Sequence, residues 1–371
     1  MSGELSIQFL PARQGDAIWI TWGAGHQILV DMGTRATGKA IRKRLSEAGG
    51  EHRAFDLLVV THIDTDHIGG VMSGLVEAKE LAPPVTFADV WFNGWEHLHD
   101  RKVSRLEGMG VKDGEKLGAW LSTRPWNEKF RRGPVRRDAT TFPVKKFPEG
   151  LTLTVLGPSK RRLVEQQSTW TKELHDALNP KRPRVRKTTL EGLGTGVEPV
   201  IDERKQLVSL AESETGIDGS AANATSICLL LEHGETRVLL TGDGLASDIA
   251  TALGELAAQR TELLDEESSR VRLDLVKMPH HGSQNNVDRA LVELITCRDW
   301  LFSSDGTIYK HPDPPAIARI LAWGDPRPRL IFTEPTAFNL WWNRADWKSR
   351  LRYSVHYGTK KDGVTWPLPR A

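Results

Sequence analysis

The chain has few of the features expected of a secreted or membrane protein. Only two of its 371 residues are cysteines, Cys228 and Cys297, and both lie in apolar runs far apart. This pattern predicts buried free thiols rather than a disulfide, which favours the cytosol. No window approaches about 18 uninterrupted apolar residues, so no membrane span is expected. Met1 to Glu4 lack a basic start followed by an apolar core, so no secretion signal is predicted.

An excess of charge of one sign is also missing. The formal net charge is +2, with 39% apolar and 26% charged residues. This balance is typical of a soluble globular protein, and the net charge identifies no partner. The sequence gives no indication of the oligomeric state.

Apolar runs of strand length, separated by turn residues, occupy the first 95 residues or so and return after residue 223. Strands are expected at 5–10, 17–22, 27–30, 55–60, 88–92, 151–156, 225–232, 236–241, 271–278, 299–303 and 330–333. Helices are expected at 39–48, 68–79, 245–267 and 316–323. Strands that alternate with helices in this way predict a layered α/β fold.

Residues 94–220 differ from the rest, because regular apolar spacing fades and charged clusters replace it. Residues 101–146 hold 13 Lys/Arg against 5 Asp/Glu, and residues 160–187 hold 9 against 3. We expect one domain over residues 1–371, in which 94–220 is mostly an insertion, partly helical and partly flexible. Its basic clusters could contact phosphates, or they could be ordinary solvated surface.

The stretch from Thr61 to Gly70 concentrates groups that bind metals. Its segment His62–His67 contains two histidines and two aspartates, and it directly follows the apolar run 55–60. Imidazole nitrogen and carboxylate oxygen are the ligands that zinc, manganese and iron prefer. A strand that ends in four such side chains predicts a metal site.

Two further strands end in the same kind of residue. Asp243 follows the strand predicted at 236–241, and His280 and His281 follow the strand at 271–278. Side chains at the carboxyl ends of strands in layered α/β folds converge on one rim, where ligands bind. We therefore expect the three groups to form one centre. Asp31, at another strand end, is expected to hydrogen-bond the His62–His67 loop, and His97 and His99 are expected at the surface.

The order of these motifs resembles the metallo-β-lactamase superfamily, and most closely the branch represented by the soluble hydrolase domain of the DNA-uptake channel ComEC. The matching motifs are His-x-Asp-x-Asp-His, a Gly-Asp pair after a strand, and His-His-Gly-Ser. Further matches are Gly15-Asp16-Ala17, Leu29 to Gly33, Asn223-x-x-Ser226, Leu240 to Asp243 and Lys310-His311-Pro312. The resemblance implies an αββα sandwich of two packed sheets with metals at one rim.

The resemblance also implies a ligand set for two divalent metal ions, zinc or manganese. It assigns His62 and Asp64 to the first ion, Asp66, His67 and His280 to the second, and Asp243 to both. The residues leave open whether His280 or His281 is the ligand.

Two departures from the superfamily pattern concern the first ion. Most members have histidine in place of Asp64, and no third histidine is present where Asn223 stands. A first site that is richer in oxygen and less complete should bind its ion more weakly and shift from zinc towards manganese or magnesium.

Paired metals about 3.5–4 Å apart activate a water and stabilise both oxygens of an in-line displacement. Asp66 or Asp243 could orient that water or take its proton. Five residues are candidates for binding the substrate or stabilising developing charge: Asn223, Lys277, His281, Ser283 and His311.

These features predict a metal-dependent hydrolase, in the first place a cytoplasmic phosphodiesterase or nuclease that contacts nucleic acid through the basic segment. One alternative is a hydrolase of a small ester, lactone or amide. Another is a metal-binding regulatory or recognition module without turnover, against which the intact set of ligands argues.

Overall fold

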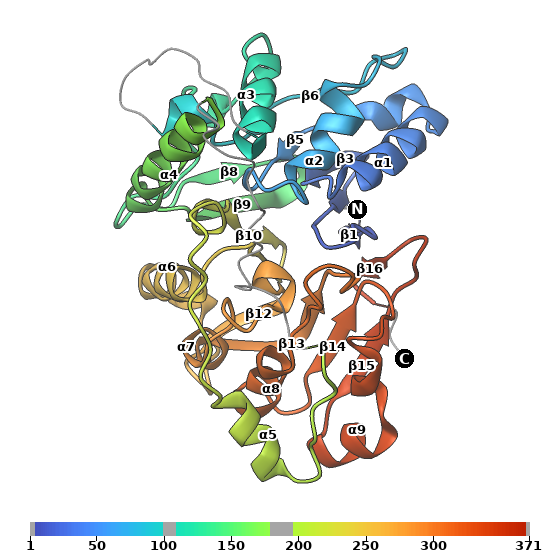
Figure 1. Ribbon diagram of the computed structural model, residues 1–371, viewed down its shortest axis with the longest axis vertical. Coiled ribbons are helices and arrows are strands. Elements are labelled where there is room, and N and C mark those ends of the chain that lie inside the picture. The colour runs from blue at the N-terminus through green and yellow to red at the C-terminus, as the bar shows by residue number, and fades with distance from the viewer. Residues whose placement is uncertain (1–3, 99–108, 179–195, 369–371) are drawn as a thin grey trace.

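The computed structural model describes residues 4–98, 109–178 and 196–368. Two mixed β-sheets face each other and helices cover their outer sides (Figure 1). The first half of the chain, blue to green, occupies the upper part of that view, and the second half occupies the lower part. The basic run 181–187, residues 101–108 and His99 lie outside the described residues.

The first sheet has six strands in the order β16-β1-β2-β3-β5-β7. Their bounds are β1 Ser6–Phe9, β2 Ile18–Trp22, β3 His26–Val30, β5 Leu57–Val59, β7 Val90–Trp91 and β16 Val364–Trp366. β16, near the end of the chain, pairs antiparallel with β1. β3, β5 and β7 run parallel, so the loops that follow them leave the same edge of the sheet.

The second sheet has eight strands in the order β15-β14-β13-β12-β11-β10-β9-β8. Their bounds are β8 Val144–Lys146, β9 Leu151–Gly157, β10 Cys228–His233, β11 Thr236–Leu240, β12 Val271–Lys277, β13 Ile295–Phe302, β14 Arg329–Phe332 and β15 Ser354–Tyr357. β11 to β15 are parallel, so the residues after β11 and β12 also share one edge. A small separate sheet pairs β4 (Ala54–Phe55) with β6 (Thr86–Phe87).

Three apolar clusters explain the layers. One lies between the sheets and joins alternate residues of both, such as Ile20 and Leu229. The second packs the outer face of the first sheet against α1 (Arg35–Glu47), α2 (Ile68–Val71), α3 (Met109–Leu121) and the start of α4 (Lys160–Leu178). The third packs the second sheet against α5 (Arg204–Ala211), α6 (Ala246–Gln259), α7 (Arg289–Leu294), α8 (Pro314–Trp323) and α9 (Ala345–Leu351). The predicted αββα sandwich is confirmed.

Several expectations need correction. The helix predicted at 245–267 ends at Gln259, because Arg260 leaves the helical conformation with φ −131° and ψ 75°. Within residues 94–220, the strand predicted at 151–156 is present as β9, which joins the second sheet together with β8. That this segment is an insertion within one domain stays a prediction.

His97 is buried, contrary to the expectation of a surface position. The Gly94 amide donates to its Nδ1, its Nε2 faces the Arg132 carbonyl at 3.1 Å, and its ring packs edge-on against Trp126. Cys228 and Cys297 are both buried and free, as predicted. In the part of the chain that is described, no helix combines the length and apolarity needed to cross a membrane.

Candidate metal centre

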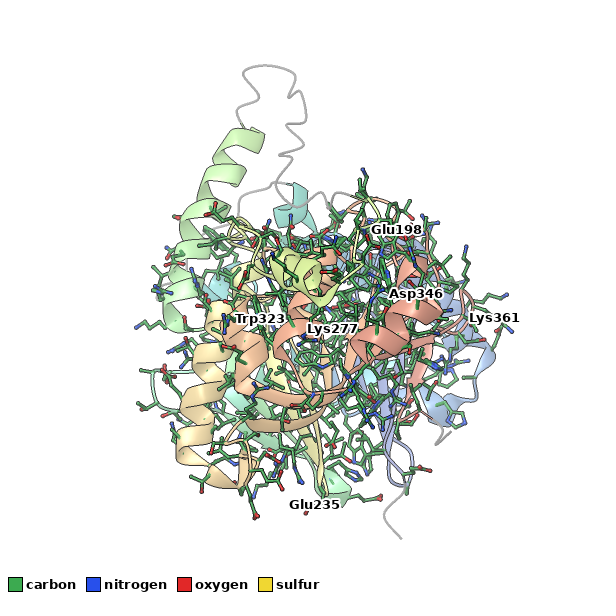
Figure 2. All side chains as sticks on the ribbon, turned by 90° about the horizontal axis from the view of Figure 1, so that it is seen from below. Glu198, Glu235, Lys277, Trp323, Asp346 and Lys361 are labelled. Atoms are coloured by element: carbon green, nitrogen blue, oxygen red, sulfur yellow. The ribbon has the colours of Figure 1, made fainter. Side chains whose placement is uncertain are left out.

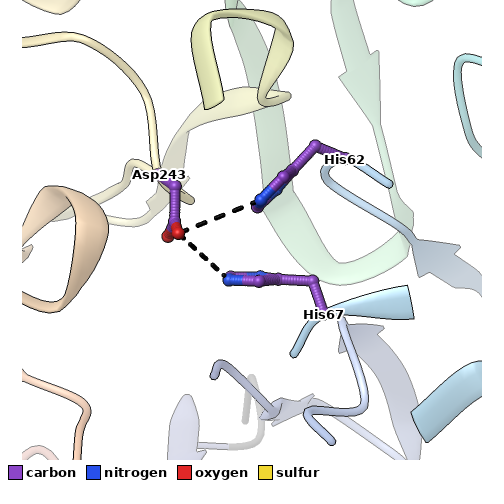
Figure 3. A group of neighbouring side chains, drawn as sticks. All are labelled: His62, His67 and Asp243. Carbon is purple, nitrogen blue, oxygen red and sulfur yellow. Dashed lines mark ion pairs between the residues drawn. The ribbon is translucent and has the colours of Figure 1, made fainter. Parts of the chain in front are cut away.

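Asp243 lies at the centre of four histidines. Its Oδ2 is 3.9 Å from Nε2 of His62, 3.3 Å from that of His67, 3.9 Å from that of His280 and 3.5 Å from that of His281. Figure 3 shows His62 and His67 pointing at Asp243 from the opposite sheet. The convergence follows from topology, because the loops after β5, β11 and β12 all leave the facing edges of the two sheets.

The backbone around the centre has unusual conformations. His280 and His281 have φ of 45° and 57°, and Gly242 before Asp243 has φ of 51°. Left-handed φ is uncommon outside glycine and marks a constrained turn. Because two histidines in sequence adopt it, their rings diverge, with centroids 5.9 Å apart and planes at 72°. Adjacent residues thus present their imidazoles to different neighbours.

Asp31 fixes the orientation of two imidazoles. Its Oδ2 accepts from Nδ1 of His67 at 2.8 Å and from the Thr61 hydroxyl at 2.6 Å. Because the Thr61 hydroxyl proton goes to Asp31, its Oγ1 is the acceptor for Nδ1 of His62 at 3.0 Å. Both histidines therefore carry their proton on Nδ1 and keep the Nε2 lone pair for the centre. The predicted contact of Asp31 with the ligand loop is confirmed.

A second relay holds His281. The Ser303 hydroxyl donates to Asp16 at 2.5 Å, so its oxygen accepts from Nδ1 of His281 at 3.3 Å. His280 has Nδ1 3.1 Å from Asp218 Oδ2 and 3.0 Å from Asn286 Oδ1. In both histidines Nδ1 carries the proton and donates it in a hydrogen bond, so Nε2 keeps its lone pair. This arrangement is found in metal-binding histidines.

Several of the buried polar atoms that lack hydrogen-bond partners lie at this centre. Among the described residues, Nε2 of His62, His67 and His281 and Oδ1 of Asp243 have no hydrogen-bond partner. Leaving such atoms buried is unfavourable unless another group satisfies them. Ligand atoms of His62, His67 and Asp243 lie within 4.8 Å of one another, as do those of Asp66, His67 and His281. The donor set therefore fits divalent metal ions.

Asp243 and the histidines around it each stabilise the charged form of the other. Burial raises the pKa of Asp243, but nearby His67 and His281 outweigh it and hold the pKa well below its ordinary value. Burial lowers the pKa of His67, while Asp243 and Asp31 raise it well above its ordinary range. Without another cation these carboxylates thus retain a proton on His67, and a metal ion must compete with that proton, whereas burial holds the pKa of His62 well below its ordinary value.

Lys277 lies beneath Asp243 and has no exposed side-chain surface. Its Nζ pairs with Asp16, donates to the Gly242 carbonyl at 3.0 Å and is 3.9 Å from Asp243 Oδ1. In Figure 2 Lys277 lies near the middle of the view, whereas Glu235 and Lys361 lie at the edge of the molecule. A buried ammonium between two carboxylates offsets their charge and fixes the loop that carries Asp243.

The other predicted site residues surround the same centre. The side chain of Asp64 is 42% exposed, and its Oδ2 lies 3.7 Å from His62 Nε2. Asp66 has Oδ2 4.0 Å from His281 Nε2. Asn223 is buried, and its amide donates to Asp218 at 2.7 Å. All six predicted metal ligands are therefore close together, and His281, predicted as a substrate residue, lies among them.

His311 and Ser283 differ in what they contact. His311 is fully buried, with its ring centroid 5.4 Å from that of His280 and its Nδ1 3.4 Å from Asp313 Oδ1. Ser283 is also buried, and it closes the turn after the histidines, where its amide donates to the His280 carbonyl and its hydroxyl accepts from Asn285. The substrate roles of both stay predictions.

Sequence reasoning missed several residues that orient the ligands: Thr61, Asp218, Asn286 and Ser303. Asp218 lies between Ile217 and Gly219, where the residue pattern indicates only a turn. Asn286 follows the His-His-Gly-Ser motif by three residues, and its proximity to the motif was the only available signal.

Comparison with solved structures found similarity at a low level. A protein from Parabacteroides distasonis ATCC 8503, assigned as a metal-dependent hydrolase, has 9% identity and a TM-score of 0.37, covering 89% of this chain and 93% of the other. The E377D mutant of CmlA beta-hydroxylase has 11% identity and a TM-score of 0.38, covering 98% and 54%. The long form of RNase Z from yeast has 8% identity and a TM-score of 0.31, covering 89% and 36%.

The comparison with curated proteins found no match. A sequence profile of the metallo-beta-lactamase superfamily, whose members are metal-dependent hydrolases, matches residues 10–306. That range contains the loops after β5, β11 and β12 and every histidine and aspartate of the centre apart from His311 and Asp313. The chain belongs to the metallo-beta-lactamase superfamily.

Proposed function

We propose that the protein is a two-metal hydrolase of phosphodiesters, with nucleic acid as its preferred substrate class. The first ion would be held by His62, Asp64 and His280, and the second by Asp66, His67 and His281. Asp243 would bind both. The observation that carries this proposal is the position of Asp243 Oδ2, 3.3–3.9 Å from Nε2 of all four histidines.

This assignment changes the role expected for the histidine pair. Asp66, His67 and His281 have ligand atoms within 4.8 Å of one another, which favours His281 for the second ion. His280 turns its ring away from that of His281 and faces Asp218 instead. It would then supply the nitrogen that the first ion lacks at Asn223.

Metal ions bound here would supply Lewis acidity and a water of lowered pKa. Asp66 would orient that water and accept its proton. Asp64, the most exposed of the ligands, marks the side from which substrate approaches. Lys277 is too deeply buried to reach a substrate, so its proposed role is to hold Asp243. His311 is as deeply buried as Lys277 and packs against His280, so its proposed role is to support the ring of His280.

The choice of a phosphodiester rests on the ligand chemistry. Asp64 supplies an oxygen ligand where most of the superfamily has histidine, which shifts the first site from zinc towards manganese or magnesium, the usual ions of phosphoryl transfer. The ComEC-like motifs at Leu240–Asp243 and Lys310–Pro312 also favour a phosphodiester substrate. Separately, the two buried free cysteines lead us to propose a cytoplasmic location. The basic segment contributes less than its charge suggests, because Arg137 and Arg162 pair with Glu255 and Asp248.

A substrate panel tests the proposal. The full-length protein with Mn²⁺ or Zn²⁺ would be incubated with labelled single- and double-stranded DNA and RNA, bis(p-nitrophenyl) phosphate, an acyl lactone and an aryl ester. We expect phosphodiester cleavage, reduced about 10²–10⁴-fold by Asp66→Ala and abolished by Asp243→Asn. Glu214→Gln, which changes an exposed carboxylate, serves as the matched control and should leave the rate unchanged.

Turnover of the lactone or ester without phosphodiester cleavage would overturn the proposed substrate class, while the assignment as a hydrolase would still hold. Metal binding with no turnover of any substrate would favour a recognition module instead.

A further inference from the structure

The loop after α5 brings a carboxylate to the metal centre from a segment with no recognised motif. Asp218 lies in this loop, seven residues after the helix ends at Ala211 and before β10 begins. Its side chain is 9% exposed, and its Oδ2 is 3.1 Å from Nδ1 of His280. The two residues are 62 positions apart in the sequence.

Several donors fix the Asp218 carboxylate in place. Oδ2 accepts from the side-chain amides of Asn223 at 2.7 Å and Asn286 at 2.9 Å, and Oδ1 accepts from the Ser220 amide at 2.8 Å. Asn286 also donates to the Asp243 carbonyl at 3.2 Å. The network therefore ties the loop to the backbone that carries Asp243. A carboxylate held by this many donors is preorganised to receive one more.

The contact determines what His280 offers to the centre. An ionised carboxylate only accepts, so Nδ1 of His280 carries the proton and Nε2 keeps its lone pair, 3.9 Å from Asp243 Oδ2. Asp31 does the same for His67 at 2.8 Å. A carboxylate behind a ligating imidazole fixes its ring and raises its basicity as a ligand.

We propose that Asp218 is a positioning residue for the metal centre: it holds His280 in the ligating tautomer and so makes the loop 212–220 part of the first metal site. This inference rests on the proposed function and on His280 as a ligand. The loop before β10 would thus have a defined role. If it were displaced, the protein would bind one metal ion more weakly and the other as before.

Calorimetric titration of the metal-free, full-length protein with Mn²⁺ tests this role. The variants would be Asp218→Ala, Asp218→Asn and His280→Ala, with Glu214→Gln as the control from the same loop. We expect two ions in the native protein. Asp218→Ala should weaken one of them about 10–100-fold and the other less than about threefold. Asp218→Asn, which still offers an acceptor oxygen, should fall between Asp218→Ala and the native protein.

Native affinity for both ions in Asp218→Ala, together with loss of one ion in His280→Ala, would overturn the positioning role while leaving the two-metal hydrolase intact. Equal weakening of both ions would overturn it as well, because the effect would then be a general loss of structure. Asp218→Asn, nearly the same shape, keeps the test decisive if Asp218→Ala unfolds. Absence of any metal binding in the native protein would instead refute the proposed function.

Discussion

Asp31 Oδ2 lies 2.8 Å from Nδ1 of His67. It also accepts from the Thr61 hydroxyl, whose oxygen in turn accepts from Nδ1 of His62. A single buried carboxylate thus orients two imidazoles that face Asp243. Asp31 itself has a left-handed φ of 54°, directly after β3. The strained turn places its carboxylate under the ligand loop rather than among the ligands.

Asp31→Asn should weaken metal binding about 10–100-fold. An amide has one acceptor oxygen where the carboxylate has two, so either the Thr61 amide or the pair formed by His67 and the Thr61 hydroxyl would face a donor, and His67 would be held less firmly for the metal. Isothermal titration with Zn²⁺ and Mn²⁺ measures the effect. Asp56→Asn is the matched control, because Asp56 holds Nδ1 of His26 at 3.0 Å outside the centre. Equal losses in both variants would contradict a specific role for Asp31.

Lys277→Met should reduce the free energy of unfolding of the metal-free protein by about 3–5 kcal/mol. The variant leaves Asp16 and Asp243 buried without their shared cation. Urea denaturation measures the change. Lys361→Met removes an exposed ammonium and should stay within about 0.5 kcal/mol of the native protein. A similarly small effect of Lys277→Met would show that the carboxylates do not need this cation.

His97 should make the protein less stable in acid. Burial lowers its folded-state pKa from 6.5 to about 4, against a smaller opposing effect of the Arg132 carbonyl. The unfolded chain therefore takes up the proton first, and stability is lost as the pH falls from about 6.5 towards 4, by up to roughly 3 kcal/mol. Urea unfolding of native protein and His97→Gln at several pH values should give a shallower slope for the variant. Parallel slopes would refute the prediction, and His233→Gln, at a partly exposed hairpin turn, is the control.

Asp64→His should shift the metal preference from manganese towards zinc. The substitution replaces an oxygen ligand with the imidazole that most of the superfamily is expected to have there, and nitrogen ligands favour zinc. Competition titrations with the two ions would show a Zn²⁺/Mn²⁺ affinity ratio at least about tenfold higher than in the native protein. An unchanged ratio would exclude Asp64 from the ligand set. Asp362→His, in an exposed loop, should have no effect.

The elements that the sequence predicts well are those whose signal is local. The strands near 18–22, 236–240 and 271–277 appear where apolar residues cluster between turns, because a buried strand needs such residues in consecutive positions. His97 was mispredicted because no local pattern shows that a histidine packs against Trp126, 29 residues later. The place of β9 in the second sheet likewise depends on its pairing with β10, which follows α5 in the chain, and β8 joins the sheet through β9.

By itself, the sequence determined the ligand types and the strand ends that carry them, since side-chain chemistry and strand periodicity are properties of neighbouring residues. Only the tertiary structure decided which atoms meet. His280 and His281 are adjacent and chemically identical, yet their left-handed backbone sends one ring towards Asp218 and the other towards Asp66 and His67. The histidine tautomers, their hydrogen-bond partners and the burial of Lys277 all depend on contacts between residues far apart in the chain. The packing of the two sheets brings those residues together.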